Sequence, residues 1–377
     1  DWYAQGNRVP LGENIKKAVS VPVGVVGVLR DPDFCDKLIA DGKVDFVVLG
    51  RTLICDPYWP QKAKEGRTEE IRPCLTCSDG CLNQLSADRF ISCSLNPAAG
   101  REATLSDVGK ACESKKVLVI GGGIGGMQAA ITAARRGHSV TLWEKDSELG
   151  GQMHLAGKPP RKKKIGEARE WFAGELGRLG VNVECSKKAS VEAVKAFAPD
   201  AVIVATGSTP IDKLPIEGCE TAAVADDIIL ETKGKMPEGK KVVIVGGGTV
   251  GCELAEMLTE KKNQVTIIEM LPQIATGMEM LHMADMMGYF MTNGVKWYTS
   301  APAKKITSNS VTFINEGKEE TIEADLVILA TGRKADNELA RQLEAEGIRV
   351  IVVGDAKEPR KFLNATLEAT YAGIDIA

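Results

Sequence analysis

The chain has 377 residues, of which 44% are hydrophobic and 26% charged, and its formal net charge is −4. These values are typical of a folded globular protein and exclude wholesale disorder, while the length predicts about two or three domains. The mild acidity argues against a dedicated nucleic-acid-binding protein, and no apolar run is long enough for a transmembrane helix. We therefore expect a cytoplasmic protein with neither a nucleic-acid nor a membrane partner, and the sequence leaves its oligomeric state open.

Residues 1–66 alternate between strand and helix patterns. The apolar runs 21–28 and 44–49 predict two buried strands. Helices are expected at 13–20, 31–42 and 57–66. Two strand–helix units indicate a parallel sheet, although two units alone cannot cover both of its faces. The chain begins at Asp1 and stops inside the predicted helix 364–377, so we expect a fragment of a longer polypeptide.

Four of the ten cysteines, Cys74, Cys77, Cys81 and Cys93, have the spacing C-x2-C-x3-C-x11-C. Thiolates this close together predict a soft-metal site in the irregular segment 67–114. Three near cysteines and one distant one suit a 4Fe–4S cluster, with one thiolate for each iron. A zinc site and a set of unrelated loop cysteines are the alternatives. A protein stabilised by disulfides would be smaller, with its cysteines spread more evenly along the chain. The cysteine pattern therefore favours a reducing compartment.

A glycine-rich turn follows the predicted strand 116–120. Gly121, Gly123 and Gly126 form the pattern G-x-G-x-x-G, and Glu144 ends the next predicted strand. The first glycine permits a tight turn, the second lets the backbone approach a pyrophosphate, and the third lets the helix pack close to the sheet. The acid can accept hydrogen bonds from ribose hydroxyls. This context predicts a dinucleotide-binding fold.

The same plan recurs 125 residues later, which indicates a duplicated domain. The second copy has Gly246, Gly248, Gly251 and Glu269, and the pair Thr206-Gly207 has its counterpart in Thr331-Gly332. A carboxylate at the ribose favours a free 2′-hydroxyl and repels a 2′-phosphate, so we expect NADH in preference to NADPH. The alternative for either turn is a Rossmann-like fold that no longer binds a nucleotide.

These motifs together resemble the 2,4-dienoyl-CoA reductase and enoate reductase group of NADH:flavin oxidoreductases, which is related to trimethylamine dehydrogenase and to old yellow enzyme. The resemblance covers nearly the whole chain. It also rests on Gly50-Arg51 with Asp56-Pro57, on Leu149-Gly150-Gly151-Gln152, on Ala205-Thr206-Gly207, and on Gly354-Asp355-Ala356 before Glu358-Pro359-Arg360. It implies an α/β protein made of the end of a (β/α)8 barrel, a short iron–sulfur segment and two nested Rossmann-like domains. The implied ranges are 1–66 for the barrel end, 67–114 for the iron–sulfur segment, 115–210 with 335–377 for an FAD domain, and 240–334 for an inserted NAD(H) domain.

The resemblance also assigns cofactor sites. Glu144 would hold the adenosine ribose of FAD, Gln152 would lie near the flavin, and Asp355 would bind the ribityl chain. The FAD site also includes Gly121, Gly123, Gly126, Thr206, Gly207 and Gly354, and the NAD site includes Gly246, Gly248, Gly251, Glu269, Thr331 and Gly332.

An FMN phosphate would lie at Gly27, Gly50 and Arg51, because backbone N–H groups and a guanidinium suit a phosphate. The chain departs from the family near Val28-Leu29-Arg30, where an arginine is expected earlier, and whether Arg30 compensates is left open. A pairing of Arg51 with a surface carboxylate is the alternative.

By this resemblance, electrons pass from NADH through FAD, the cluster and FMN to an activated C=C bond. The substrate would be a small molecule such as an enoate or a CoA thioester. The proton donor and substrate pocket of the family lie in the first six barrel units, so no catalytic residue can be named here. An amine dehydrogenase-type flavoprotein and an electron-transfer module serving a partner are the alternatives. The basic run Arg161, Lys162, Lys163 and Lys164 is expected to be a solvated loop or helix start.

Overall fold

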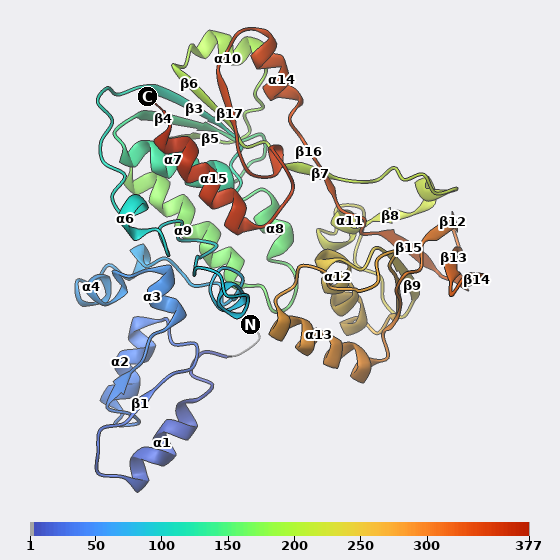
Figure 1. Cartoon of the computed structure of the whole chain (residues 1–377), viewed down its shortest axis with the longest axis horizontal. Coiled ribbons are helices and arrows are strands. Elements are labelled where there is room, and N and C mark those ends of the chain that lie inside the picture. The colour runs from blue at the N-terminus through green and yellow to red at the C-terminus, as the bar shows by residue number, and fades with distance from the viewer. Residues whose placement is uncertain (1–3, 377) are drawn as a thin grey trace. The chain divides into compact units, whose positions relative to one another are not determined.

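The structure is a computed structural model that describes residues 4–376 (Figure 1). The chain forms two compact units, each described by itself below. The first holds the residues up to 153, residues 161–207 and those from 337 onward, and the second holds residues 154–160 and 208–336. Within the described residues, no helix is both long and apolar enough to cross a membrane.

The first unit begins with two strand–helix repeats. Its elements are α1 (Val9–Ala18), β1 (Gly24–Val25), α2 (Pro32–Ala40), β2 (Phe46–Val47), α3 (Arg51–Cys55) and α4 (Trp59–Lys64). Strands β1 and β2 pair in parallel, as predicted, and Val25, Leu38 and Val44 pack in one core. The expectation of a buried strand over 21–28 was wrong in extent, because only Gly24–Val25 pairs and Val21 is 65% exposed.

The segment that carries the four cysteines is largely irregular, as predicted. It contains a short 3-10 helix (Thr68–Glu70) and the helices α5 (Leu82–Ser86) and α6 (Glu102–Leu105). It packs on the elements around it through side-chain contacts. Trp171 Nε1 donates to the Glu70 carbonyl at 2.9 Å, and the Arg72 guanidinium lies 4.7 Å from the centre of the Trp171 ring.

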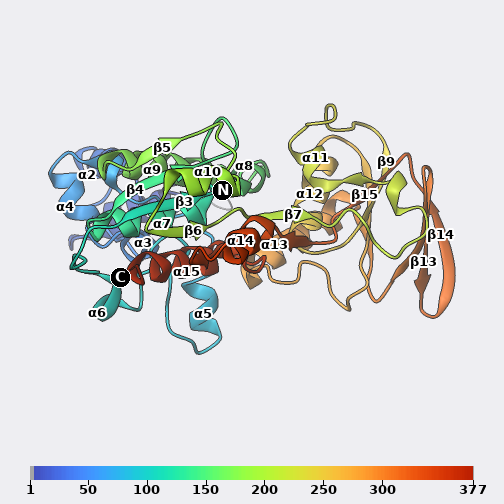
Figure 2. The same cartoon turned by 90° about the horizontal axis from the view of Figure 1, so that it is seen from above.

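The first unit is built around a parallel five-stranded sheet with the order β17-β6-β3-β4-β5. Its strands are β3 (Lys116–Ile120), β4 (Ser139–Trp143), β5 (Asn182–Glu184), β6 (Ala201–Val204) and β17 (Val350–Val352). Its helices are α7 (Ile124–Arg135), α9 (Lys164–Arg178), α10 (Val191–Phe197), α14 (Glu338–Ala345) and α15 (Phe362–Ile374). Helices α7 and α15 run side by side (Figure 2), joined by a 3.1 Å hydrogen bond from Gln128 to Thr370. Leu118 and Val202 pack on the opposite side against Val194 of α10 and Leu343 of α14.

The second unit repeats this sheet with the order β11-β10-β9-β15-β8, again in parallel. Its strands are β8 (Ala223–Val224), β9 (Lys241–Val245), β10 (Gln264–Ile268), β11 (Lys296–Tyr298) and β15 (Leu326–Leu329). The accompanying helices are α11 (Ala225–Ile229), α12 (Thr249–Glu260) and α13 (Met280–Asn293). The run β15-β9-β10-β11 has the same order as β6-β3-β4-β5, so the duplication seen in the sequence is also a duplication of topology.

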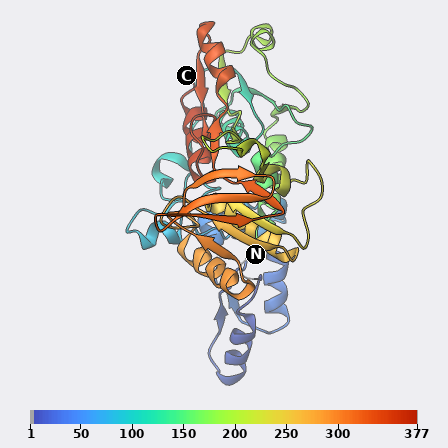
Figure 3. The same cartoon turned by 90° about the vertical axis from the view of Figure 1, so that its right-hand side faces the viewer.

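A three-stranded antiparallel sheet completes the second unit (Figure 3). It consists of β12 (Ala303–Thr307), β13 (Ser310–Asn315) and β14 (Lys318–Glu323). Phe313 and Val311 are fully buried and share a core with Val243 and Val327 of the parallel sheet. A further antiparallel pair, β7 (Ser208–Pro210) with β16 (Arg333–Ala335), brings the two ends of the second unit together.

Candidate functional site

Two of the three motif glycines in the first glycine-rich turn have a steric reason, and the remaining one faces open space. Gly121 has a φ of +106°, and a Cβ there would lie 2.2 Å from the Ala205 carbonyl oxygen. A Cβ on Gly126 would lie 1.8 Å from the Gly121 oxygen, so any side chain would push α7 off the sheet. Gly123, at the N-cap of α7, faces open space, and a Cβ there would have no neighbour within 4 Å. The turn is therefore closed on its inner side and leaves room for a ligand at Gly123.

The second turn reproduces this arrangement. Gly246 has a φ of +108° and approaches the Ala330 oxygen, where a Cβ would come within 2.3 Å. A Cβ on Gly251 would lie 2.0 Å from the Gly246 oxygen, whereas Gly248, at the N-cap of α12, again faces open space. Both helices are 12 residues long, so each presents a full N-terminus to a phosphate group.

Each turn is held by the acid that the sequence singled out. Glu144 accepts hydrogen bonds from Gly122 N at 2.5 Å and Asp146 N at 2.8 Å. Glu269 accepts from Gly247 N at 2.5 Å and Leu271 N at 2.7 Å. Both carboxylates are nearly buried, at 4% and 7% exposed. Each oxygen keeps a lone pair beyond the backbone bond, so the acid can hold its own turn and still accept from a ribose hydroxyl.

The other residues assigned to the first nucleotide fold come from distant parts of the sequence. Gln152, which begins α8 (Gln152–Ala156), donates from Nε2 to Asp355 Oδ2 at 2.9 Å. Asp355 also accepts from Arg360 N at 3.1 Å, and Gly354, with a φ of +62°, donates to Glu368 Oε2 at 3.1 Å. The structure thus brings Gln152, Gly354 and Asp355 together within the first unit.

Thr206-Gly207 and Thr331-Gly332 follow equivalent strands, β6 and β15. Gly207 has a φ of +82° and Gly332 a φ of +94°, so both turns use the left-handed region that favours glycine. The amide of Gln152 lies 3.8 Å from a Cβ position on Gly207, which places Gly207 beside the Gln152–Asp355 pair. Thr331 Oγ1 donates to the Ile211 carbonyl at 3.2 Å and fastens its turn to the residues after β7.

The loop that carries Cys74, Cys77 and Cys81 directs backbone N–H groups at its sulfur atoms. Thr76 N donates to Cys74 Sγ at 3.4 Å. Backbone N–H groups of Asp79, Leu82, Leu95 and Asn96 act to lower the pKa values of the other three cysteines. Such bonds stabilise a thiolate, which is the form of cysteine that binds metals. The donor set therefore fits a thiolate-bound cluster.

The four thiols interact with one another but differ in acidity. Burial raises the pKa of Cys74 to about 12, whereas a hydrogen bond from Cys55 lowers the pKa of Cys93 to about 6. Cys55 is a fifth, fully buried thiol at the end of α3 that the spacing argument missed. All ten cysteines are free. Across residues 4–376, no three His, Cys, Asp or Glu side chains lie in an arrangement that could hold a metal ion.

Two positively charged side chains hold the loop between Cys74 and Cys81. Arg51 donates from Nη1 to Ser78 Oγ at 2.9 Å and to the Thr76 carbonyl at 3.4 Å, and it contacts no carboxylate among the described residues. The alternative of a surface ion pair for Arg51 is therefore wrong. Lys164 begins α9, as the expected helix start implies, but it donates from Nζ to Thr76 Oγ1 at 3.1 Å and is only 2% exposed, so the expectation of solvation was wrong for this residue. Burial lowers the pKa of Lys164 to about 8.

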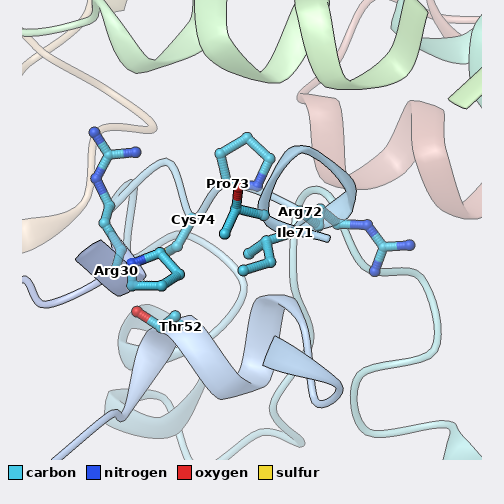
Figure 4. Close-up of a pocket in the computed structure, with 8 residues that line it drawn as sticks. Arg30, Thr52, Ile71, Arg72, Pro73 and Cys74 are labelled. Carbon is cyan, nitrogen blue, oxygen red and sulfur yellow. The ribbon is translucent and has the colours of Figure 1, made fainter. Parts of the chain in front are cut away.

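A cavity of about 140 Å³ borders Cys74 (Figure 4). It is lined by Arg30, Pro32, Thr52, Thr68, Ile71, Arg72, Pro73 and Cys74. The guanidinium groups of Arg30 and Arg72 lie at opposite sides of the view, and the Nε atom of each is buried without a hydrogen-bond partner. Arg30 binds both carboxylate oxygens of Glu167, so this arginine is engaged within the chain.

The residues assigned to an FMN phosphate differ in their surroundings. Gly50 precedes α3 and has open space where a Cβ would be, whereas a Cβ on Gly27 would lie 2.8 Å from Asn7 Oδ1. Gly27 also accepts a backbone hydrogen bond from Gly6 at 2.9 Å. Gly50 and Arg51 are thus adjacent to the cysteine loop, and Gly27 packs against the turn before α1.

Comparison with known proteins covers both parts of the chain. The family described as pyridine nucleotide-disulphide oxidoreductase matches residues 115–358, and the NADH:flavin oxidoreductase / NADH oxidase family matches residues 3–70. The chain is 45% identical over 369 residues to an NADH oxidase of Thermoanaerobacter brockii, with 96% of the chain and 56% of that protein covered. It is 36% identical to a cinnamate reductase of Clostridium sporogenes, with 98% of the chain and 55% of that protein covered.

Among solved structures, a 2-naphthoyl-CoA reductase matches with a TM-score of 0.93 and 31% identity over 99% of the chain and 57% of that protein. The chain thus spans little more than half the length of these relatives. The expected α/β fold class, with a barrel end and Rossmann-like folds, is confirmed. The chain belongs to the pyridine nucleotide-disulphide oxidoreductase family and, with its flavin oxidoreductase segment, to the NADH oxidase and enoate reductase group that its motifs indicated.

Proposed function

We propose that this chain is the electron-input part of an NADH-dependent iron–sulfur flavoprotein that reduces an activated C=C bond. The observation that carries the proposal is the repeated turn in which a buried acid, Glu144 or Glu269, holds a glycine-rich loop beside an open position at Gly123 or Gly248. Two such turns in one chain suit two dinucleotides, one that stays bound and one that binds and leaves in each turnover.

The first fold, residues 115–210 with 335–377, would bind FAD, and the second, residues 240–334, would bind NADH. The FAD site would comprise Gly121, Gly123, Gly126, Glu144, Gln152, Thr206, Gly207, Gly354 and Asp355. The NADH site would comprise Gly246, Gly248, Gly251, Glu269, Thr331 and Gly332. Glu269 supports NADH over NADPH, because its carboxylate would meet a 2′-phosphate with like charge.

Cys74, Cys77, Cys81 and Cys93 would hold a 4Fe–4S cluster in the segment 67–114. The N–H groups near their sulfur atoms support thiolate ligation, and the spacing of three near cysteines and one distant one favours a cluster over zinc. The phosphate of FMN would lie at Gly50 and Arg51, with Gly27 nearby, in the barrel end formed by residues 1–66. When bound, these groups supply hydride acceptance at a flavin and one-electron transfer at a cluster.

The substrate class follows from the relatives. The cinnamate reductase and the 2-naphthoyl-CoA reductase are named for substrates that carry a conjugated acid or a CoA thioester. We therefore propose an enoate or enoyl thioester as the electron acceptor of the complete enzyme.

The experiment is to prepare the chain anaerobically and to measure bound flavin, iron and acid-labile sulfide. We expect four iron and four sulfide atoms per chain, together with reduction of an artificial dye by NADH. Cys77→Ala should lose the iron, while Cys219→Ala, a buried free thiol of the second unit, should keep it. One zinc without sulfide would refute the cluster, and bound FAD without NADH-driven dye reduction would refute the assignment of the second fold.

A further inference from the structure

Lys164 is a buried lysine at the end of a basic run. It is 2% exposed at the start of α9, whereas its neighbour Lys163 is exposed. Lysine is almost never fully buried unless a polar or negatively charged partner compensates the lost hydration. The burial of Lys164 therefore indicates that its amine interacts with the group that it faces.

The group that Lys164 faces is the cysteine loop. Its Nζ donates to Thr76 Oγ1 at 3.1 Å, and Thr76 N in turn donates to Cys74 Sγ at 3.4 Å. Thr76 thus links the Lys164 amine to the Cys74 sulfur atom. Thr76 has a φ of +54°, a left-handed conformation that costs free energy for a non-glycine residue and persists only where neighbours hold it.

The other charged groups around this loop are largely paired. Glu167 is bound by Arg30 through both carboxylate oxygens, and Asp79 is bound by Lys361, so each pair is close to neutral as a unit.

Arg51 adds a second positive charge at the same loop through Thr76 and Ser78. Lys164 and Arg51 therefore place two cationic groups at the Cys74 side of the loop. A thiolate-bound cluster carries the opposite charge.

We propose that Lys164 is a positioning residue for the cluster, raising its reduction potential by its charge and holding Thr76 so that its N–H meets Cys74. This inference rests on the proposed function. Reduction adds one electron and forms or breaks no bond, so the reduced cluster carries one more negative charge. A cation fixed nearby in a site of low dielectric constant stabilises that state more than the oxidised one.

The test compares Lys164→Met, Lys164→Arg and the control Lys163→Met in the anaerobic holoprotein at pH 7. Iron content and the midpoint potential from a redox titration followed by electron paramagnetic resonance are measured. We expect Lys164→Met to lower the equilibrium constant for cluster reduction about tenfold, which is about 59 mV for one electron. Lys164→Arg and Lys163→Met should match the wild type.

Each other outcome decides the proposal. Loss of iron in Lys164→Met with retention in Lys164→Arg supports it, because the charge is then what holds the loop. Loss in both variants overturns it, since the packing of the side chain rather than its charge is then required. An unchanged potential in iron-loaded Lys164→Met overturns it while leaving the proposed function intact. A wild-type protein without iron and sulfide refutes the proposed cluster itself, and with it this inference.

Discussion

Gln152 donates a hydrogen bond of 2.9 Å to Asp355, although the two residues are 203 positions apart in the chain. Gln152 follows the first glycine-rich turn, and Asp355 follows β17, which lies beyond the whole second unit in the sequence. The other oxygen of the Asp355 carboxylate, Oδ1, accepts a hydrogen bond from Arg360 N at 3.1 Å. The first nucleotide fold is therefore completed by a segment that is synthesised only after the second fold.

Asp355→Asn should weaken FAD binding without unfolding the protein. The substitution keeps the size of the side chain but removes a charge that strengthens its hydrogen bonds, an effect of about 1.5–3 kcal/mol. We expect at least about a tenfold rise in the Kd for FAD, measured by fluorescence titration of the flavin-stripped protein. Asp375→Asn, at an exposed residue that follows α15, is the control and should leave the Kd unchanged.

Gly126→Ala and Gly123→Ala should separate stability from binding. Gly126→Ala forces a methyl group against the Gly121 oxygen and should cost about 1–3 kcal/mol of unfolding free energy. Gly123→Ala meets open space at a φ of −71°, so the unfolding free energy of the apoprotein should stay within about 0.5 kcal/mol while FAD binding weakens. Denaturant titration and flavin titration measure the two quantities. Equal effects of both variants on stability would contradict the steric assignment.

Glu269→Gln should shift the preference between the nicotinamide cofactors. Removing the charge relieves its repulsion of a 2′-phosphate, and the ratio of kcat/KM for NADPH to that for NADH should rise about tenfold, or about 1.4 kcal/mol. Steady-state dye reduction with each cofactor gives the ratio. Glu144→Gln, the equivalent change in the first fold, should alter FAD binding and leave the ratio as in the wild type.

Glu175 should make the first unit sensitive to acid. Its burial acts to raise the pKa of the carboxyl, but hydrogen bonds and charge from Arg135 and Arg178 outweigh this, and the pKa is lowered. A carboxyl whose folded pKa lies below its unfolded value, near 4.5, stabilises the fold above that pH and ceases to do so as the pH falls through the folded pKa.

Glu175→Gln should therefore cost about 1–2 kcal/mol at pH 7, and the difference from the wild type should shrink below pH 4.5. Denaturant midpoints at several pH values measure it. Glu113→Gln, which removes an ion pair at a side chain that is 75% exposed, should change little at any pH. A penalty for Glu175→Gln that is constant with pH would show that the ion pairs are not its cause.

Local chemistry made much of this fold predictable. The first and third glycines of each turn occupy positions where a Cβ would collide with a backbone oxygen, so this part of the pattern follows directly from the geometry. Glu144 and Glu269 close that geometry over only 22 residues, which a spacing rule can capture.

Tertiary contacts could not be predicted in the same way. Lys164 belongs to a run of four basic residues that is typical of a solvated surface, and its burial depends on Thr76, which lies 88 positions away. Likewise, Arg51 was assigned by its place after Gly50, and nothing in the sequence indicated that Ser78 would accept its hydrogen bond. The predicted strand 21–28 is short for a related reason: a strand needs a partner, and only Gly24–Val25 finds one in β2.

The side chains that hold the cysteine loop also set a sequence of events in biosynthesis. Residues 74–93 leave the ribosome well before Lys164, which binds Thr76, and before Lys361, which binds Asp79. The nascent loop gains the first of these contacts only after residue 164 has been added, and the second only after residue 361. The contacts that hold this loop are therefore complete only after residues far beyond it in the sequence have been added and have folded back onto it.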